Sequence, residues 1–194
     1  IPKLKSILNE IRTINNSCNY ENKIINMEAI GAELYWNYIK ELTRDDEINF
    51  THRERHGATD LVNCMLNYGY AILYARIWQT VLSKKMNPTQ SIIHKPQNGK
   101  PTFVYDIIEL FRTQAVDRVV ISLIQKKEPL KLKQGLLDNE TKKLLIKNIT
   151  ERINRYEKYR GGEYRLIDII NMQIKEIANF IDNRTKYKPY IAKW

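Results

Sequence analysis

The sequence is poor in the residues that build disulfide frameworks and turn-rich sheets. Its 194 residues include two cysteines, Cys18 and Cys64, and no CxxC pair, which excludes a disulfide scaffold or a zinc ribbon. With 7 glycines and 6 prolines, it lacks the turns of a β-sandwich or barrel. It also lacks a Gly-rich phosphate loop, a dinucleotide fingerprint and a nucleophile elbow. We therefore expect free thiols in a reducing, cytoplasmic setting.

Long hydrophobic runs are absent as well. The longest apolar stretch, 61–82, is interrupted by Asn63, Asn67, Arg76 and Gln79, so we expect no membrane span. Hydrophobic residues still make up 43% of the chain, which is enough for one domain with a real core. The net charge is +10, and an excess of this size favours a polyanionic partner such as nucleic acid.

Apolar residues recur at helical spacing along nearly the whole chain, which predicts a single all-α domain of about six helices. The segments expected to be helical are 3–15, 22–42, 61–84, 103–126, 138–158 and 165–183. Thr59 or Asp60 is a candidate N-cap for the third segment, which is apolar almost all round and is expected to be central. Residues 85–101 read as a loop, and Pro189 argues against a helix in the tail, 184–194. No strand alternation stands out.

Positive charge is concentrated toward the C-terminus. Residues 126–165 contain twelve Lys and Arg against six Asp and Glu, and the tail has four basic residues and no acid. These two segments account for the whole net charge. They predict either a solvated helical face or a surface that binds phosphates, and the sequence pattern alone leaves both open.

Several carboxylates fall among apolar residues, where an unpaired charge is costly to bury. Glu28 shares a helix side with Ile24 and Ile25, and Gly31 leaves open space beside it. A boundary glutamate that reaches solvent is the alternative for Glu28. Asp106 and Glu109 are three residues apart on one predicted helix face, with Arg112 one turn further on. Such carboxylates bind a metal or pair with a cation, and Arg112 is the candidate cation for a purely structural pair.

A histidine stands just before this acidic helix. His94 lies in the predicted loop, which can fold a nitrogen ligand back toward Glu28 and Glu109. Two carboxylates and one imidazole form a mixed oxygen and nitrogen site that suits Mn²⁺ or Mg²⁺. A loop histidine can equally be a polar surface residue. The pair His52 and His56 has zinc-helix spacing, but it lacks a glutamate directly after the first histidine and indicates a polar, basic loop.

The predicted central helix carries a polar stripe, Asn63, Asn67, Tyr70 and Tyr74, at steps of three or four residues. These side chains are either buried amides and hydroxyls satisfied by their neighbours, or groups that orient metal ligands or substrate.

Three strings carry a family signature: Asp60-Leu-Val-Asn-Cys-Met-Leu-Asn-Tyr-Gly-Tyr70, His94-Lys95 and Tyr105-Asp-Ile-Ile-Glu-Leu-Phe-Arg112. Together they resemble the CRISPR adaptation integrase, the larger subunit of the complex that inserts new spacers into CRISPR arrays. Met27-Glu28, followed by Tyr35, is similar to the family's first metal-ligand motif, although Ala29 stands where a glycine often follows. The resemblance runs from about residue 24 to 118.

The resemblance implies that Glu28, His94 and Glu109 are catalytic and hold Mg²⁺ or Mn²⁺, with Asp106 in support. It implies a DNA integrase and endonuclease of antiviral defence, which joins strands by transesterification when the 3′-OH of incoming DNA attacks a phosphodiester. We expect DNA contacts from Arg53, Arg55, Lys95 and Arg112.

The resemblance also implies partners. They are spacer-precursor and CRISPR-repeat DNA, a second copy bound through a β-rich N-terminal domain, a small ferredoxin-like subunit and, in some members, a fused reverse transcriptase. We expect 1–194 to be the helical catalytic domain without that β-rich domain, with a lead-in helix in 1–22. The alternatives are a non-catalytic basic module that binds nucleic acid and a protein-interaction domain of a larger fusion.

Overall fold

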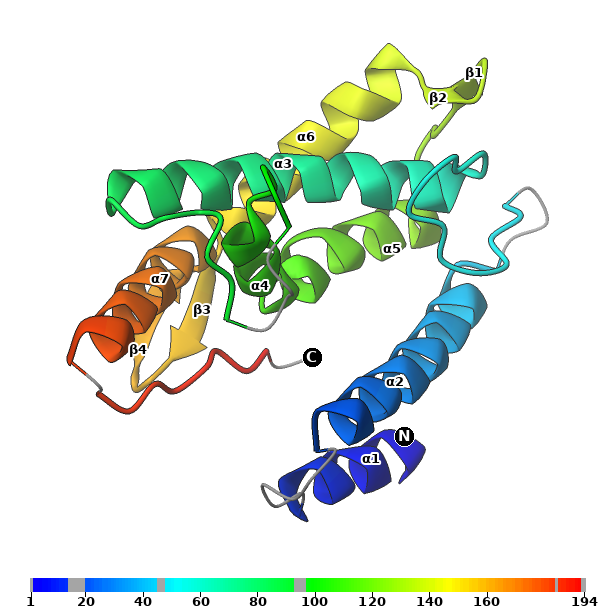
Figure 1. The fold of residues 1–194 in the computed structure, drawn as a ribbon. Coiled ribbons are helices and arrows are strands. Elements are labelled where there is room, and N and C mark those ends of the chain that lie inside the picture. Colours follow the sequence, from blue (N-terminus) through cyan, green and yellow to red (C-terminus); the bar gives the residue numbers. More distant parts are fainter. Residues whose placement is uncertain (1, 14–19, 45–47, 93–96, 184, 193–194) are drawn as a thin grey trace.

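The computed structural model describes residues 2–13, 20–44, 48–92, 97–183 and 185–192. The first two helices, α1 (Pro2–Thr13) and α2 (Tyr20–Leu42), pack against each other. Figure 1 shows α2 reaching the rest of the molecule at its C-terminal end, while its N-terminal end lies with α1 away from the other helices. Residues 22–30 are exposed except for the half-buried Met27, so none of these nine residues is fully buried.

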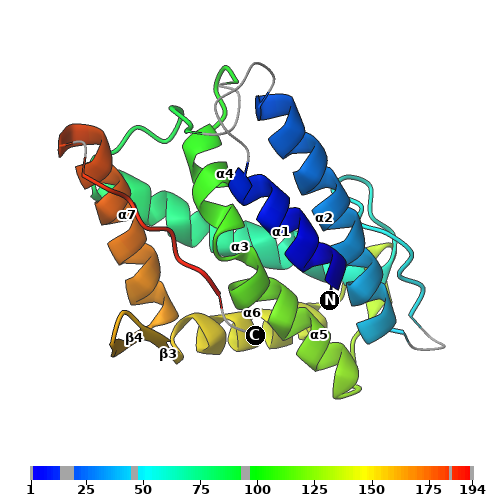
Figure 2. The same ribbon diagram turned by 90° about the horizontal axis from the view of Figure 1, so that it is seen from below.

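The central element is α3 (Leu61–Ser83), as its all-round apolar pattern predicts. Asp60 is its N-cap, and Oδ1 of Asp60 accepts a hydrogen bond from the amide of Asn63 at 2.9 Å. The helix packs against elements on several sides, including α4, α6 and α7, and Figure 2 shows it running across the middle of the molecule. Its buried residues include Val62, Leu73 and Ile77, which belong to the hydrophobic core.

The predicted single helix over 103–126 is wrong in detail, because the structure divides it. The segment forms α4 (Thr102–Glu109), a short π-helix η1 (Thr113–Asp117) and α5 (Arg118–Gln125). The amide of Arg118 bonds to the carbonyl of Thr113, five residues back, so one extra residue enters the turn. Such π-turns occur mostly inside α-helices and frequently at functional sites. Here the turn brings Gln114 and Asp117 into the core.

The C-terminal third contains two hairpins that the helical pattern does not predict. The elements are β1 (Leu132–Lys133), β2 (Leu136–Leu137), α6 (Asn139–Ile153), β3 (Tyr156–Tyr159), β4 (Gly162–Arg165) and α7 (Leu166–Asn183). The expected helix over 138–158 therefore ends early. Arg160 and Gly161, both with positive φ, form the two-residue turn between β3 and β4. Two successive positive φ values match the twist of a tight antiparallel hairpin. The Arg160-Gly161 pair is therefore the local signal for the hairpin, which helical spacing does not detect.

The tail is extended over 185–192, in agreement with the prediction that it is not helical. Gln173 of α7, which is fully buried, accepts hydrogen bonds at Oε1 from the amide of Tyr190 (2.7 Å) and the hydroxyl of Tyr187 (2.6 Å). The ring of Tyr190 stacks on Phe111 with 5.1 Å between centroids. The tail therefore returns to the junction between α4 and η1.

The fold class is confirmed as predominantly helical, with only small two-stranded sheets among the described residues. In the same residues, no helix is both long and apolar enough to span a bilayer. Cys64 is a half-buried free thiol whose pKa is raised by burial, and Cys18 lies outside the described residues.

Candidate functional site

Glu28 lies on the exposed half of α2. The neighbours that were expected to bury it, Ile24 and Ile25, are themselves 37% and 57% exposed, so the cost of burial that singled out Glu28 does not apply in this chain. The expected open space is present, because a Cβ placed on Gly31 would meet no atom within 4 Å. Glu28 is therefore a solvent-accessible carboxylate with room beside it.

Glu109 lies at the end of α4 and forms an ion pair with Arg112. The distance from Nη1 of Arg112 to Oε1 of Glu109 is 2.9 Å, and the two side chains are 23% and 40% exposed. This is the paired arrangement that the sequence left open for Glu109. Since Glu109 remains partly exposed, its carboxylate keeps a face toward solvent.

Asp106 does not share the surroundings of Glu109, although the two are three residues apart. It is 7% exposed, and its Oδ2 accepts a hydrogen bond from the amide of Ile92 at 2.5 Å. Asp106 thus anchors the chain two residues before His94. Both His94 and Lys95 lie outside the described residues, so their predicted roles stay predictions.

Two residues of the polar stripe of α3, Asn63 and Asn67, form hydrogen bonds with the loop between α2 and α3. The guanidinium of Arg53 donates to Oδ1 of Asn63 at 2.9 Å and to Oδ1 of Asn67 at 2.5 Å. Its Cζ lies 5.7 Å from the ring centroid of Trp36 and 5.3 Å from that of Tyr70, a cation–π sandwich. Burial lowers the pKa of Arg53. In this arrangement Arg53 ties the loop to α2 and α3.

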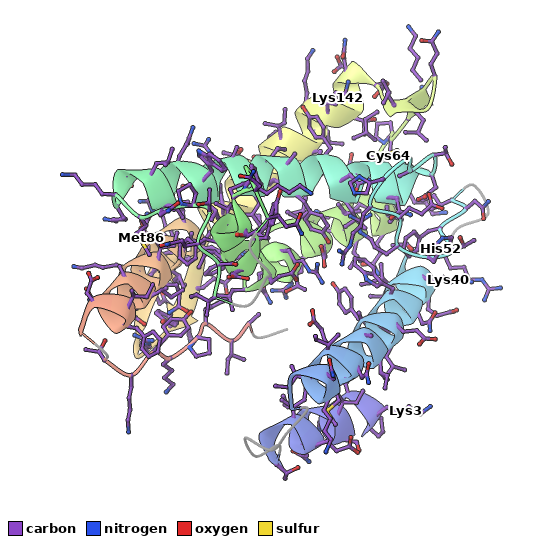
Figure 3. All side chains as sticks on the ribbon, viewed as in Figure 1. Lys3, Lys40, His52, Cys64, Met86 and Lys142 are labelled. Atoms are coloured by element: carbon purple, nitrogen blue, oxygen red, sulfur yellow. The ribbon has the colours of Figure 1, made fainter. Side chains whose placement is uncertain are left out.

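The remaining basic and histidine residues of this loop lie nearer the surface. Arg55, His52 and His56 are exposed, and Figure 3 shows His52 on the loop next to the C-terminal end of α2. Among the described residues, no three His, Cys, Asp or Glu side chains are grouped closely enough to hold a metal ion. Since His94 is not among them, the predicted Glu28, His94 and Glu109 set stays a prediction.

Sequence reasoning missed the most buried acid of the region, Asp117. Its Oδ2 accepts a hydrogen bond from the hydroxyl of Tyr35 and its Oδ1 one from the hydroxyl of Tyr70, both at 2.5 Å. Burial raises the pKa of Asp117, while the two hydroxyls and the charges of Arg112 and Arg53 act in the opposite direction. The sequence signal for this buried acid was its position in the mostly apolar segment 115–121.

Burial also raises the pKa of both tyrosines, and the charge of Asp117 adds to this effect. Tyr35 and Tyr70 are therefore neutral hydrogen-bond donors at physiological pH, not activated nucleophiles. The prediction that Tyr70 supports the site concerns this cluster, which also includes Tyr35 and Asp117.

The basic C-terminal third borders an open groove of about 740 Å³ between α5, α6 and β3. The groove is lined by Arg118, Ser122, Lys126, Asn148, Glu151, Arg152, Arg155, Tyr156 and Glu157, together with Val119. Arg152 is neutralised by Glu157, at 2.6 Å, whereas Lys126 and Arg155 are exposed. Positive charge is thus accessible at a concave surface in the segment that the sequence singled out.

These features define a class of protein: a helical domain in which Asp117 joins α2 and α3 to η1 through two tyrosine hydroxyls, with an exposed glutamate on α2 and a partly exposed one at the end of α4. The model of the family described as CRISPR associated protein Cas1 matches residues 1–183. The chain belongs to this family, which confirms the resemblance.

Two relatives illustrate the match. The CRISPR-associated endonuclease Cas1 1 of Francisella tularensis subsp. novicida is 31% identical over 196 residues, covering 100% of this chain and 57% of that protein. The protein of the same name from Archaeoglobus fulgidus is 29% identical over 184 residues, covering 89% of this chain and 53% of that protein. The chain therefore spans little more than half the length of these relatives.

Two solved structures share the fold. A casposase bound to its integration product superposes with a TM-score of 0.80 at 22% identity, over 96% of this chain and 59% of that one. A CAS1 protein from Thermotoga maritima gives a TM-score of 0.78 at 17% identity, over 94% of this chain and 62% of that one.

Proposed function

We propose that this chain is the catalytic domain of a metal-dependent DNA endonuclease and integrase of CRISPR adaptation. Membership of the Cas1 family, relatives named as endonucleases and a fold shared with a casposase support this function. The observation that carries the proposal is that the helix of Glu28 is hydrogen-bonded to Asp117, and Asp117 lies near the arginine that pairs with Glu109. Arg112 pairs with Glu109 and lies close to the cluster of Asp117 and Tyr35, and Tyr35 shares α2 with Glu28.

The donor set fits a hard divalent cation. Glu28 and Glu109 offer carboxylate oxygens that solvent reaches, and His94 adds an imidazole nitrogen. Oxygen-rich sites of this kind suit Mg²⁺ or Mn²⁺ better than thiolate-binding metals. A bound ion supplies positive charge that polarises the target phosphodiester and stabilises the departing oxygen.

The chain's own residues hold the reactants. Arg112 orients Glu109, and its guanidinium is suited to bind a phosphate once that carboxylate turns toward a cation. Asp106 fixes the backbone that leads to His94. Lys126 and Arg155 at the groove bind the DNA backbone at a distance from the chemistry.

The proposed reaction is a phosphoryl transfer. In joining, the oxygen of a 3′-OH forms a bond to phosphorus and loses its proton, while the bond to the target strand's 3′ oxygen breaks and that oxygen takes up a proton. When water replaces the 3′-OH, the same exchange cleaves the strand. The half-buried, neutral Tyr35 and Tyr70 are poor nucleophiles, which agrees with a transfer that forms no covalent protein intermediate.

The proposal extends to the setting of the whole protein. We propose that it acts in the cytoplasm on spacer-precursor and repeat DNA. We also propose a second copy joined through an N-terminal β-rich domain, and a small ferredoxin-like subunit. A fused reverse transcriptase is a further candidate partner.

The test uses the purified 194-residue chain and branched DNA with a 3′ flap, with Mn²⁺ or Mg²⁺ or with a chelator. We expect cleavage or joining only with metal. Glu28→Gln and Glu109→Gln should each reduce the rate by at least about 100-fold, and His94→Ala should act likewise. The matched control is Glu33→Gln, an exposed glutamate on the same helix as Glu28, which should keep full activity.

Binding of the DNA with steep salt dependence but no cleavage or joining under any metal condition contradicts the proposal. That outcome favours the non-catalytic basic module, a function that the exposed Lys126 and Arg155 also support. Full activity of Glu28→Gln, Glu109→Gln and His94→Ala rejects the assignment of the site.

A further inference from the structure

The half of α2 that carries Glu28 is held to the molecule from one end. Residues 22–30 are exposed apart from the half-buried Met27, and the side chains become buried only further along, where Ile39 is 1% exposed. Figure 1 shows the N-terminal half of α2 extending away from α3, α4 and α5. A small change in the angle of α2 therefore moves Glu28 more than any residue of the core.

Tyr35 is the polar anchor near this point. It lies seven residues, or two turns, after Glu28, so the two side chains project from the same face of α2, about 10 Å apart along the axis. Its hydroxyl donates to Oδ2 of Asp117 at 2.5 Å, across 82 residues of sequence. The bond attaches α2 directly to the π-turn that continues from α4.

Asp117 divides its two oxygens between two helices. While Oδ2 accepts from Tyr35 of α2, Oδ1 accepts from Tyr70 of α3, and Asp117 itself is 1% exposed. A carboxylate in this position holds both helices at fixed distances from η1. The extra residue of the π-turn sets the side of the segment on which Asp117 falls.

The same cluster extends to Glu109 through charge. Arg112 is paired with Glu109 at 2.9 Å, and its charge acts on Asp117, Tyr35 and Tyr70. The guanidinium of Arg53 lies over the ring of Tyr70, with 5.3 Å from Cζ to the ring centroid. Arg112 therefore connects the ion pair of Glu109 to the Asp117 cluster that holds the helix of Glu28.

We propose that Asp117 is a positioning residue, which acts through Tyr35 to hold α2 so that Glu28 and Glu109 face one cation site. The inference rests on the proposed function for what the two carboxylates do. The hold on α2 by Asp117 is a property of the fold and can be measured without a metal.

Two tyrosine variants separate positioning from stability. Tyr35→Phe and Tyr187→Phe each remove one hydroxyl that donates to a buried side-chain oxygen, to Asp117 at 2.5 Å and to Gln173 at 2.6 Å, and leave the ring in place. We expect both to lower the melting temperature by similar amounts. Only Tyr35 joins the helix of Glu28, because Tyr187 belongs to the tail, which carries no proposed ligand.

The first measurement is Mn²⁺ binding, followed by the electron paramagnetic resonance signal of free Mn²⁺. Tyr35→Phe should weaken binding by about tenfold, in the range seen for residues that orient metal ligands. Tyr187→Phe should stay within about twofold of the parent chain. Cleavage by Tyr35→Phe should recover at high Mn²⁺ concentration, since its ligands are intact. Equal weakening by both variants, or by neither, overturns the inference.

The second measurement is hydrogen exchange of the α2 backbone without metal. Tyr35→Phe should speed exchange of peptides that cover residues 24–33 by several-fold, and Tyr187→Phe should leave them unchanged. If the parent chain binds no Mn²⁺, the proposed metal site is wrong. The exchange experiment needs no metal, so it still tests whether the bond from Tyr35 to Asp117 restrains α2. Unchanged exchange in Tyr35→Phe rejects the role of Asp117 whatever the metal result.

Discussion

Gly69 lies within α3, and its replacement by alanine sets two effects of opposite sign against each other. Alanine favours a helix over glycine by about 1 kcal/mol. A Cβ at this position, however, would lie 2.5 Å from Cγ1 of Val116 and 3.1 Å from Cδ1 of Ile149. Both neighbours are fully buried, so neither can swing into solvent. Overpacking of a core costs about 1–3 kcal/mol, and we therefore expect Gly69→Ala to destabilise the protein by about 1 kcal/mol net.

Gly31→Ala is the matched control. It is the same change in another helix, but a Cβ on Gly31 meets nothing within 4 Å, so the helix-forming gain of about 0.5–1 kcal/mol should appear undiminished. For a chain of this length, 1 kcal/mol moves the melting temperature by about 2–4 °C. Thermal unfolding followed by circular dichroism should thus give shifts of opposite sign for the two variants.

The double variant Gly69→Ala with Val116→Ala tests the cause. Removal of the Val116 methyl groups makes room for the new Cβ, so the two changes together should cost at least about 1 kcal/mol less than the sum of their separate costs. A melting temperature that rises in Gly69→Ala as it does in Gly31→Ala refutes the reasoning. Simple additivity in the double variant does so as well.

Two further predictions concern buried polar groups. Burial raises the pKa of Asp117, so the folded protein binds this proton more tightly than the unfolded chain does. The resulting contribution to the free energy of unfolding is full below the pKa of the unfolded chain, near 4, and is lost as pH rises through the pKa of the folded protein. The melting temperature of Asp117→Asn minus that of the parent should therefore rise from pH 4 to pH 7. A difference that stays constant or falls over this range contradicts the raised pKa of Asp117. Gln173→Leu removes the acceptor for Tyr187 and Tyr190, so it should cost about 2 kcal/mol and open the tail to trypsin, while the exposed Gln125→Leu should do neither. If trypsin cuts the tail of Gln173→Leu no faster than that of the parent, Gln173 does not hold the tail in place.

Local patterns in the sequence predict most of the helices. The cap Asp60, the extent of α3 and the non-helical segments 85–92 and 97–101 depend on residues close together in the chain, and the structure agrees with them. The hairpin at 156–165 was missed because its two strands are only four residues long, and the Arg160-Gly161 turn was taken as a break between helices. Helical spacing also gives no warning of the π-turn at 113–117, since one extra residue leaves the apolar pattern almost unchanged.

The sequence likewise predicts only part of the candidate site. The motifs around Glu28, His94 and Glu109 indicate the family from sequence alone, because together they resemble its signature. Tertiary structure alone decides which groups meet: Arg53 reaches the amides of α3, and the two tyrosine hydroxyls reach Asp117. It also leaves Glu28 exposed, which is the alternative that helical periodicity left open. The physical reason is that burial and hydrogen bonding between helices depend on how segments 47 to 82 residues apart pack together, which no local pattern records.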